Sequence, residues 1–326
     1  MKKVLIAILL LGLLPHASAD YIHWVDFRLS APVLRSALEL DMASQGGEQP
    51  LDWIDILALA AVWRGGTGVT VADTQRAAQA LRGDTPPERL SGMAGRFFSY
   101  YRAAYGAALG GLVGHFAIRR TDPQTGEAEW IPAYGLKAFS PIAAGYFWSH
   151  YPDFGAQRSY GYVRPHLGND ILGALGTPIC AVEGGTVEAL GWNRYGGWRI
   201  GIRSDDRKRY YYYAHLRKDA PYAEGLAVGQ RVQAGDVIGF MGRTGYSAQE
   251  NVNNIETVHL HFGLQLIFDE SQKECDSEIW IDVYPIIELL ASHCSSVARD
   301  PQTGRWERLY PYCDLDAEPL RSAAAR

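Results

Sequence analysis

The sequence predicts an α+β protein, in which a mainly antiparallel β domain follows an N-terminal helical region. Apolar residues recur at helical spacing over 31–110, for example at Trp53, Leu57 and Ala61. From about 138 to 290 the pattern changes to short apolar segments separated by glycine turns, which is typical of an all-β sheet or a barrel-like sandwich. No long linker separates the two regions.

Three helices can be placed individually. The pattern over Asp73–Leu81 predicts a capped helix that ends near Gly83, and the helical pattern resumes over Ser91–Leu109. A further helix is expected over 281–293, after the last predicted strands.

Two copies of one pentapeptide predict β-hairpin turns. Asp122–Gly126 lies between the strand-like segments His115–Arg120 and Ala128–Ala133, and the same five residues return at Asp300–Gly304. The final glycine supplies the left-handed conformation that such a turn requires. Two copies are too few for a repeat architecture.

The N-terminus has the composition of a secretory signal peptide. Lys2 and Lys3 precede the apolar run Val4–Leu14, and Ala17-Ser18-Ala19 forms a small-x-small cleavage site. The apolar run is shorter than the about 20 residues that a membrane-spanning helix needs, although an uncleaved anchor remains the alternative. We therefore expect an exported protein, located in the periplasm, the cell envelope or the extracellular space, with no transmembrane segment after signal removal.

These patterns together predict five regions. In chain order they are a signal peptide (1–19), a helical region of unassigned role (20–118), a β-hairpin connection (119–137), a β domain (138–290) and a C-terminal extension with a hairpin and a flexible tail (291–326).

The charge and the cysteine content argue against a nucleic-acid-binding surface and against a zinc site built from cysteine. With 31 Lys and Arg against 36 Asp and Glu, the formal net charge is −5, so a nucleic-acid partner is not expected. Cys180 lies in an apolar strand-like segment and is predicted to be a buried free thiol. We expect one disulfide among the other cysteines, Cys275, Cys294 and Cys313. No C-x-x-C pair is present, which disfavours a zinc site built from cysteine.

Four histidines and one aspartate form three groups in the β region. His166 and Asp170 flank a Gly-containing turn, His215 follows Tyr213-Ala214, and His259 and His261 are two residues apart. In a strand, residues two apart point to the same face, so His259 and His261 share a surface. Each group alone is common in structural roles.

Together, the three groups fit a hydrolytic zinc site. Such a site uses three protein ligands and keeps one position open for water, and two histidines with one aspartate provide that number. Two further imidazoles then remain for acid–base work near neutral pH. The spacing alone does not choose which three of the five residues bind the metal.

The order and spacing of these groups resemble the lysostaphin and LytM type of zinc endopeptidase, which cleaves peptide bonds in bacterial peptidoglycan. The resemblance covers about 140–268 and rests on the H-x-G-x-D, Y-A-H-L and H-L-H-F elements. It also includes Gly176-Thr177-Pro178, Gly185-Thr186-Val187, Tyr195-Gly196-Gly197 and Met241-Gly242-Arg243-Thr244-Gly245.

The resemblance implies that His166, Asp170 and His261 bind one Zn²⁺ ion and that His215 and His259 are the catalytic imidazoles, in an order that the sequence leaves open. It implies a zinc-dependent endopeptidase whose catalytic β domain hydrolyses peptidoglycan stem peptides or cross-bridges. All five chemical positions are intact, which argues against an inactive regulator.

Some features lie outside the pattern. The segment Tyr246–Val258 is longer than is usual in the family, so the resemblance does not choose the cleaved bond. Tyr160, Asn193, Arg194 and Tyr195 are candidate groove residues. The alternative function is a non-catalytic envelope module that binds peptidoglycan or activates another hydrolase, and a protein partner is not identified.

Overall fold

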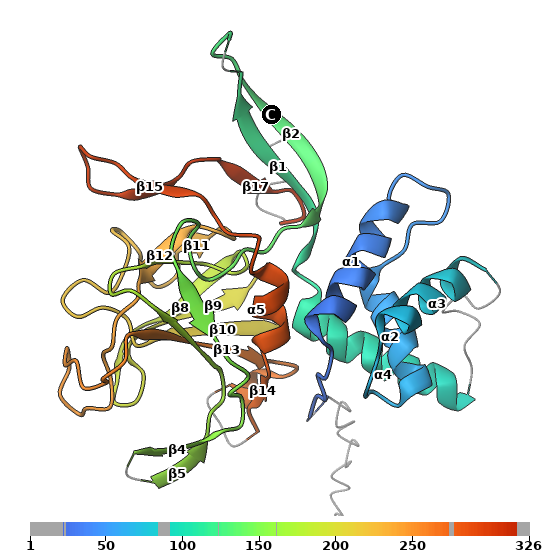
Figure 1. Ribbon diagram of the computed structural model, residues 1–326, viewed down its shortest axis with the longest axis horizontal. Helices are drawn as coiled ribbons and strands as arrows, with labels where there is room; N and C mark the ends of the chain where they lie inside the picture. Colours follow the sequence, from blue (N-terminus) through green and yellow to red (C-terminus); the bar gives the residue numbers. More distant parts are fainter. Residues whose placement is uncertain are drawn as a thin grey trace, which may run out of the picture.

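The computed structural model describes residues 22, 24–83, 92–122, 124–160, 162–273 and 277–317, with the side chains of Met93 and Tyr160 excepted. The predicted signal peptide and the predicted tail from 318 lie outside the described residues. The described chain is an α+β protein, as predicted: most of its helices precede an antiparallel β region. Figure 1 shows the helical region beside the β region, with one C-terminal helix between them.

The described part of the helical region contains four helices, two of which have clear capping signals. Asp52 caps one helix by accepting a hydrogen bond from the backbone N–H of Ile54, and Gly65 ends it in the left-handed conformation. The predicted capped helix begins earlier than Asp73, because Thr70 is the cap and Asp73 completes a capping box at the third helical position. The four helices are α1 (Ala31–Ser44), α2 (Trp53–Arg64), α3 (Val71–Arg82) and α4 (Gly92–Leu109).

An eight-stranded antiparallel sheet forms the centre of the β region, in the order β11-β8-β9-β10-β13-β6-β3, with β14 paired to β13. Its strands are β3 (Trp148–His150), β6 (Asn169–Gly173), β8 (Gly185–Asn193), β9 (Gly197–Ser204), β10 (Arg209–Ala214), β11 (Arg231–Val232), β13 (His259–Leu266) and β14 (Ile279–Ile281). Two smaller pairs, β4 (Gln157–Tyr160) with β5 (Tyr162–Pro165) and β7 (Pro178–Cys180) with β12 (Val237–Phe240), flank the sheet. A 3₁₀ turn, η2 (Glu270–Gln272), follows β13.

Both copies of the repeated pentapeptide form hairpin turns, as predicted. The first joins β1 (Val113–Thr121) to β2 (Ala128–Leu136), and the second joins β15 (Val297–Arg299) to β16 (Trp306–Arg308). Strand β17 (Tyr312–Asp314) then returns to pair with β1. The C-terminal segment is thereby tied to the hairpin that leaves the helical region (Figure 1).

The predicted C-terminal helix is α5 (Tyr284–Leu290). It packs against α1, and its buried face contributes Ile287 and Leu290 to a hydrophobic core that runs from the helical region into the sheet. Because apolar burial stabilises in proportion to area, this shared core holds the two regions together.

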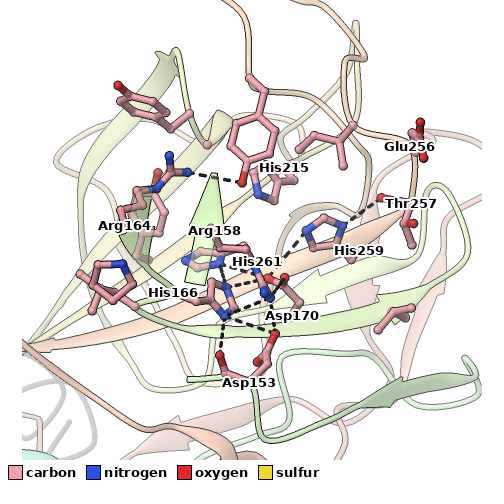
Figure 2. A pocket seen from close by; sticks show the side chains of 18 of the residues that line it. Asp153, Arg158, Arg164, His166, Asp170, His215, Glu256, Thr257, His259 and His261 are labelled. Atoms are coloured by element: carbon pink, nitrogen blue, oxygen red, sulfur yellow. Dashed lines mark hydrogen bonds and ion pairs between the residues drawn. The ribbon is translucent and has the colours of Figure 1, made fainter. Parts of the chain in front are cut away.

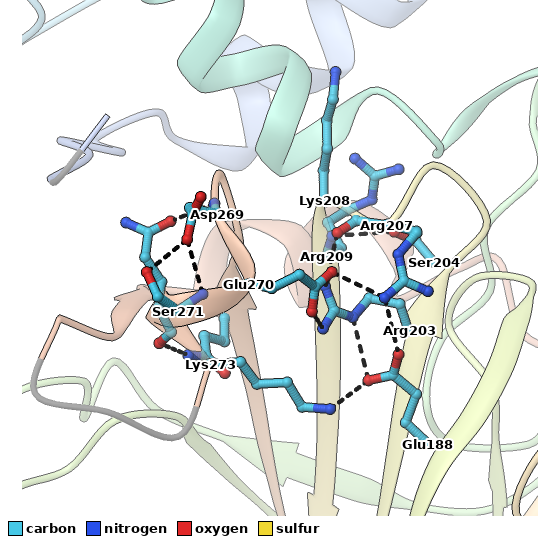
Figure 3. A network of polar contacts seen from close by, with 12 residues as sticks. Glu188, Arg203, Ser204, Arg207, Lys208, Arg209, Asp269, Glu270, Ser271 and Lys273 are labelled. Atoms are coloured by element: carbon cyan, nitrogen blue, oxygen red, sulfur yellow. Dashed lines mark hydrogen bonds and ion pairs between the residues drawn. The ribbon is translucent and has the colours of Figure 1, made fainter. Parts of the chain in front are cut away.

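A buried ion pair adds a polar connection between the regions. Arg209 on β10 is 1% exposed and binds Glu183 through two nitrogens, at 2.7 and 3.0 Å. Its third nitrogen donates to the carbonyls of Ala107 and Gly106 at the end of α4. A cation there satisfies orphan helix carbonyls and complements the helix dipole. Beside Arg209, a more exposed network links Arg203 to two carboxylates (Figure 3).

The cysteines correct one prediction. Cys180 is a buried free thiol, as expected, but Cys294 and Cys313 also carry free thiols. They lie on separate elements, one just after α5 and one within β17, and Cys275 lies outside the described residues. The expected disulfide is therefore wrong for this structure. Among the described residues, no helix combines the length and apolar character needed to cross a bilayer.

Candidate active site

Strand pairing brings three candidate ligands together (Figure 2). His261 on β13 lies directly opposite Asp170 on β6 in the antiparallel register, and His166 precedes β6 by one short turn. His166 Nε2 lies 2.8 Å from His261 Nδ1 and 3.0 Å from Asp170 Oδ1, and His261 Nδ1 lies 3.1 Å from the same oxygen. Two nitrogens and one carboxylate oxygen therefore converge on one point.

Gly168 makes this approach possible. A Cβ atom at this position would lie 2.6 Å from His261 Cε1 and 2.7 Å from the carbonyl oxygen of Phe262. Only glycine leaves room for the imidazole ring here. This steric requirement explains why the H-x-G-x-D element has glycine at this position.

The electrostatics of the three groups are strongly coupled. Burial favours the neutral form of Asp170, but the hydrogen bonds from His166 and His261 outweigh it and hold the pKa of Asp170 well below its usual range. Burial likewise opposes protonation of His166, but Asp153 and Asp170 together raise the pKa of His166 to about 9. Burial lowers the pKa of His261. Without a metal, the cluster therefore holds a proton between His166, Asp170 and His261, at the place where a cation would bind.

The two other histidines present one ring nitrogen each to this cluster. His215 Nδ1 donates to the carbonyl of Thr244 and His259 Nδ1 donates to the carbonyl of Thr257, both at 2.9 Å. A carbonyl only accepts, so Nε2 of each neutral ring is left as the acceptor. The two ring centroids are 4.8 Å apart, and His259 Nε2 lies 3.7 Å from Asp170 Oδ1.

Burial, with smaller contributions from His259 and His261, holds the pKa of His215 well below its ordinary value. Its imidazole is therefore neutral at neutral pH. His215 also has a backbone φ of 61°, a left-handed conformation that costs energy in a non-glycine residue and is concentrated at functional sites.

A second layer of side chains was not predicted from the sequence. Asp153 accepts from His166 Nδ1 at 3.2 Å, and Arg158 Nη2 donates to Asp153 at 2.8 Å and to Asp170 Oδ2 at 3.1 Å. Asn169 continues the network by donating to Asp153 Oδ1. Such contacts orient metal ligands. Of these residues, only Asn169 had a signal in the sequence, because it lies within the H-x-G-x-D motif.

The same network extends to His150 on β3. Its Nδ1 lies 2.6 Å from Asn169 Oδ1, and its Nε2 lies 2.7 Å from Glu288 on α5. The imidazole thus connects the second layer of the site to the C-terminal helix.

A groove of about 780 Å³ opens above the five residues. Tyr195 lines it, together with Arg164 and Tyr246. Asn193 and Arg194 are not among its lining residues: Asn193 holds the following turn by accepting from the backbone of Tyr195 and Gly196, and Arg194 is exposed. Tyr160 ends β4, and its side chain lies outside the described residues.

The donor set fits a metal ion. One atom from each of His166, Asp170 and His261 lies within 4.8 Å of the others. Nitrogen and carboxylate oxygen are zinc ligands, and donors about 2.1 Å from a tetrahedral ion lie about 3.3 Å apart. The observed separations of 2.8–3.1 Å require only a small opening of the cluster.

Comparisons with known proteins agree with this geometry. Residues 164–274 match the model of peptidase family M23. The L-Ala--D-Glu endopeptidase of Bacillus subtilis is 36% identical over 178 residues, which cover 51% of this chain and 52% of that protein. Lysostaphin of Staphylococcus simulans is 37% identical over 98 residues, which cover 30% of this chain and 17% of that protein. The chain thus spans about half the length of one relative and a smaller part of the other.

Solved structures give related matches. A structure from Ruminococcus gnavus, proposed to be the glycyl-glycine endopeptidase LytM, is 26% identical with a TM-score of 0.49, and the match covers 82% of this chain and 91% of that one. The catalytic domain of lysostaphin from Staphylococcus simulans is 28% identical with a TM-score of 0.34, over 43% of this chain and 92% of that one. The segment of the chain that matches peptidase family M23 is residues 164–274.

Proposed function

We propose that this chain is a zinc-dependent endopeptidase that hydrolyses peptide bonds in bacterial peptidoglycan. The observation that carries the proposal is the convergence of His166 Nε2, Asp170 Oδ1 and His261 Nδ1 beneath an open groove. The imidazoles of His215 and His259 lie beside these three atoms. Three ligands next to two acid–base groups is the arrangement that metal-assisted hydrolysis requires.

In this proposal His166, Asp170 and His261 hold one zinc ion. When bound, zinc acts as a Lewis acid that polarises a carbonyl and lowers the pKa of water from 15.7 toward about 7. Asp153 and Arg158 keep His166 and Asp170 in their orientations through the hydrogen bonds described above.

The two remaining imidazoles divide the proton transfers. His215 is neutral and its Nε2 is an acceptor, so it takes the proton of the attacking water. His259, whose Nε2 lies 3.7 Å from Asp170 Oδ1, is the remaining imidazole, and we assign to it the proton transfer to the departing amine. The carbonyls of Thr244 and Thr257 hold both rings in place.

The substrate and the location belong to the proposal as well. Two relatives are named for different bonds, one as an L-Ala--D-Glu endopeptidase and one as a glycyl-glycine endopeptidase. Both a stem peptide and a cross-bridge are therefore candidates. We propose that residues 1–19 direct export, so that the protein acts in the periplasm, the envelope or outside the cell.

The deciding experiment is digestion of purified peptidoglycan by the metal-loaded full chain, followed by mass analysis of the released fragments. We expect one zinc ion per chain and new amino termini. In the variant His215→Ala the zinc content should stay the same, while turnover falls by about 10²-fold or more, the scale of one acid–base group. Stoichiometric zinc without new amino termini would instead support a non-catalytic binding module.

If His215→Ala keeps full activity, the proposed role of this imidazole is wrong. If the wild-type chain binds no zinc and releases no fragments, the whole proposal is wrong.

A further inference from the structure

Arg164 is a groove residue for which the proposed mechanism has no use. It lies on β5 and lines the groove. Its guanidinium carbon is 4.6 Å from the centre of the Tyr195 ring and 5.5 Å from that of Tyr246. Its Nη2 donates to the Tyr246 hydroxyl at 3.3 Å (Figure 2). Stacking on these rings restrains the planar fork of the side chain.

The other terminal nitrogen of Arg164 has no partner. Nη1 is buried and makes no hydrogen bond with any described residue. A buried donor without an acceptor costs about 1–3 kcal/mol, and more on a charged group. The observation therefore indicates that an acceptor is supplied from outside the chain.

The charge of Arg164 is also uncompensated. Arg158 is the other arginine that lines the groove, and it is paired with both Asp153 and Asp170. No carboxylate of the described residues lies within ion-pair distance of Arg164, and Glu256 lies across the site from it (Figure 2). The missing partner is thus an anion, and the planar fork of an arginine matches a carboxylate in particular.

The position of Arg164 relates this anion to the reacting bond. The Tyr246 ring that it contacts has its centre 5.9 Å from that of His215. An extended peptide advances about 3.3 Å per residue. The guanidinium carbon of Arg164 therefore lies no more than about 11 Å from the His215 ring, so a carboxylate that Arg164 binds lies within about three to four extended residues of the cleaved bond.

We infer that Arg164 binds a free carboxylate of the substrate, and that the enzyme cleaves near an acidic residue of a stem peptide rather than within a glycine bridge. The inference rests on the proposed function and narrows its substrate class. A glutamate that is linked through its side-chain carboxyl leaves its α-carboxylate free beside a peptide bond, whereas the interior of a glycine bridge contains no such group. The carboxylate supplies the acceptor that Arg164 lacks.

The test uses two synthetic stem peptides of identical backbone, in which the α-carboxylate of a γ-linked D-glutamate is either free or converted to a carboxamide. A pentaglycine peptide and purified peptidoglycan complete the set. We expect the wild-type enzyme to cleave the free-acid peptide with a kcat/KM about 10- to 100-fold higher than that of the amide, the scale of one charge-assisted hydrogen-bonded pair. Pentaglycine should not be cleaved.

Arg164→Gln should remove this preference by slowing cleavage of the free acid alone. Arg164→Lys, which keeps the charge but not the fork, should retain part of it. Arg217→Gln is the matched control: Arg217 also stacks on an aromatic ring, that of Phe240 at 5.1 Å, but it does not line the groove. Binding of both peptides to His215→Ala, measured by calorimetry, gives a readout that does not depend on turnover and should show the same preference.

Equal cleavage of the two stem peptides, selective cleavage of pentaglycine, or an unchanged preference in Arg164→Gln would overturn the inference. Cleavage of peptidoglycan but of neither stem peptide would overturn it too. In each case the proposed function stands. Failure to cleave any of the four substrates would instead overturn the proposed function.

Discussion

Two carboxylates, the buried Glu183 and the half-buried Asp170, show how differently this fold uses charge. Glu183 accepts from two nitrogens of Arg209 and from the hydroxyl of Tyr211 at 2.6 Å. Burial and the Glu183 charge raise the pKa of Tyr211 well above its ordinary value, so the phenol remains a donor. The donors and acceptors of this cluster satisfy one another.

Asp170 has the opposite surroundings. Three imidazole nitrogens lie within 3.7 Å of its Oδ1 atom. A groove opens above them. The comparison teaches that a buried ion pair which is complete within the chain serves the structure, whereas a carboxylate surrounded by surplus nitrogen atoms is suited to a cation. The predictions below test this difference.

The largest effect is expected at Asp170. The nearly isosteric change Asp170→Asn removes the negative charge, so the cluster should lose its metal. Zinc content should fall from one ion per chain to none, and hydrolysis by about 10³-fold or more, because a bound metal contributes several kcal/mol to transition-state charge stabilisation. Metal analysis and fragment release measure both. Wild-type zinc content in this variant would show that the two carboxylates do not differ in the way proposed.

At the cluster of Glu183, Arg209 and Tyr211, a substitution should change the stability of the fold. Arg209→Met leaves Glu183 buried without its cation, which should lower the free energy of unfolding by about 3–5 kcal/mol, measured by urea denaturation. The folded protein should keep its zinc. The exposed pair of Arg231 and Asp205, with side chains 27% and 35% exposed, is the control, and Arg231→Gln should change stability by less than about 1 kcal/mol. A similar loss in both variants would contradict the distinction between buried and exposed pairs.

The smallest effect concerns a third carboxylate, Asp73 at the start of α3. Hydrogen bonds from Arg64 and Thr70 lower the pKa of Asp73 to about 2. Because the unfolded chain has a pKa near 3.8, this carboxylate stabilises the fold above about pH 4, and the contribution is lost as the pH falls toward 2. Asp73→Asn should cost about 1–2 kcal/mol at pH 7 and should flatten the decrease in stability between pH 4 and 2. Urea titrations at several pH values measure the free energy of unfolding. If its decrease between pH 4 and 2 is the same in Asp73→Asn as in the wild type, this role of Asp73 is ruled out.

Local sequence patterns predicted much of the fold because their causes are local. The two pentapeptide turns form hairpins since their glycines supply the conformation that the turns need, and α4 follows its apolar spacing. The start of α3 was placed too late, because Thr70 and Asp73 act as a reciprocal pair rather than as one cap. The expected disulfide was wrong because sequence separation does not report the distance between two thiols.

For the candidate site, residue type and spacing were enough to predict the five side chains, since a zinc site needs particular residue types that strand alternation and short turns can bring to one face. They did not identify Asp153, Arg158 or Arg164. Asp153 and Arg158 act through contacts with residues 5 to 16 positions away, and Arg164 contacts Tyr246, which is 82 positions away. In the sequence, each of the three looks like any exposed charge. Only the tertiary structure, by pairing β13 with β6 and placing the β4–β5 pair beside the groove, decided which charges are satisfied within the chain and which face a ligand.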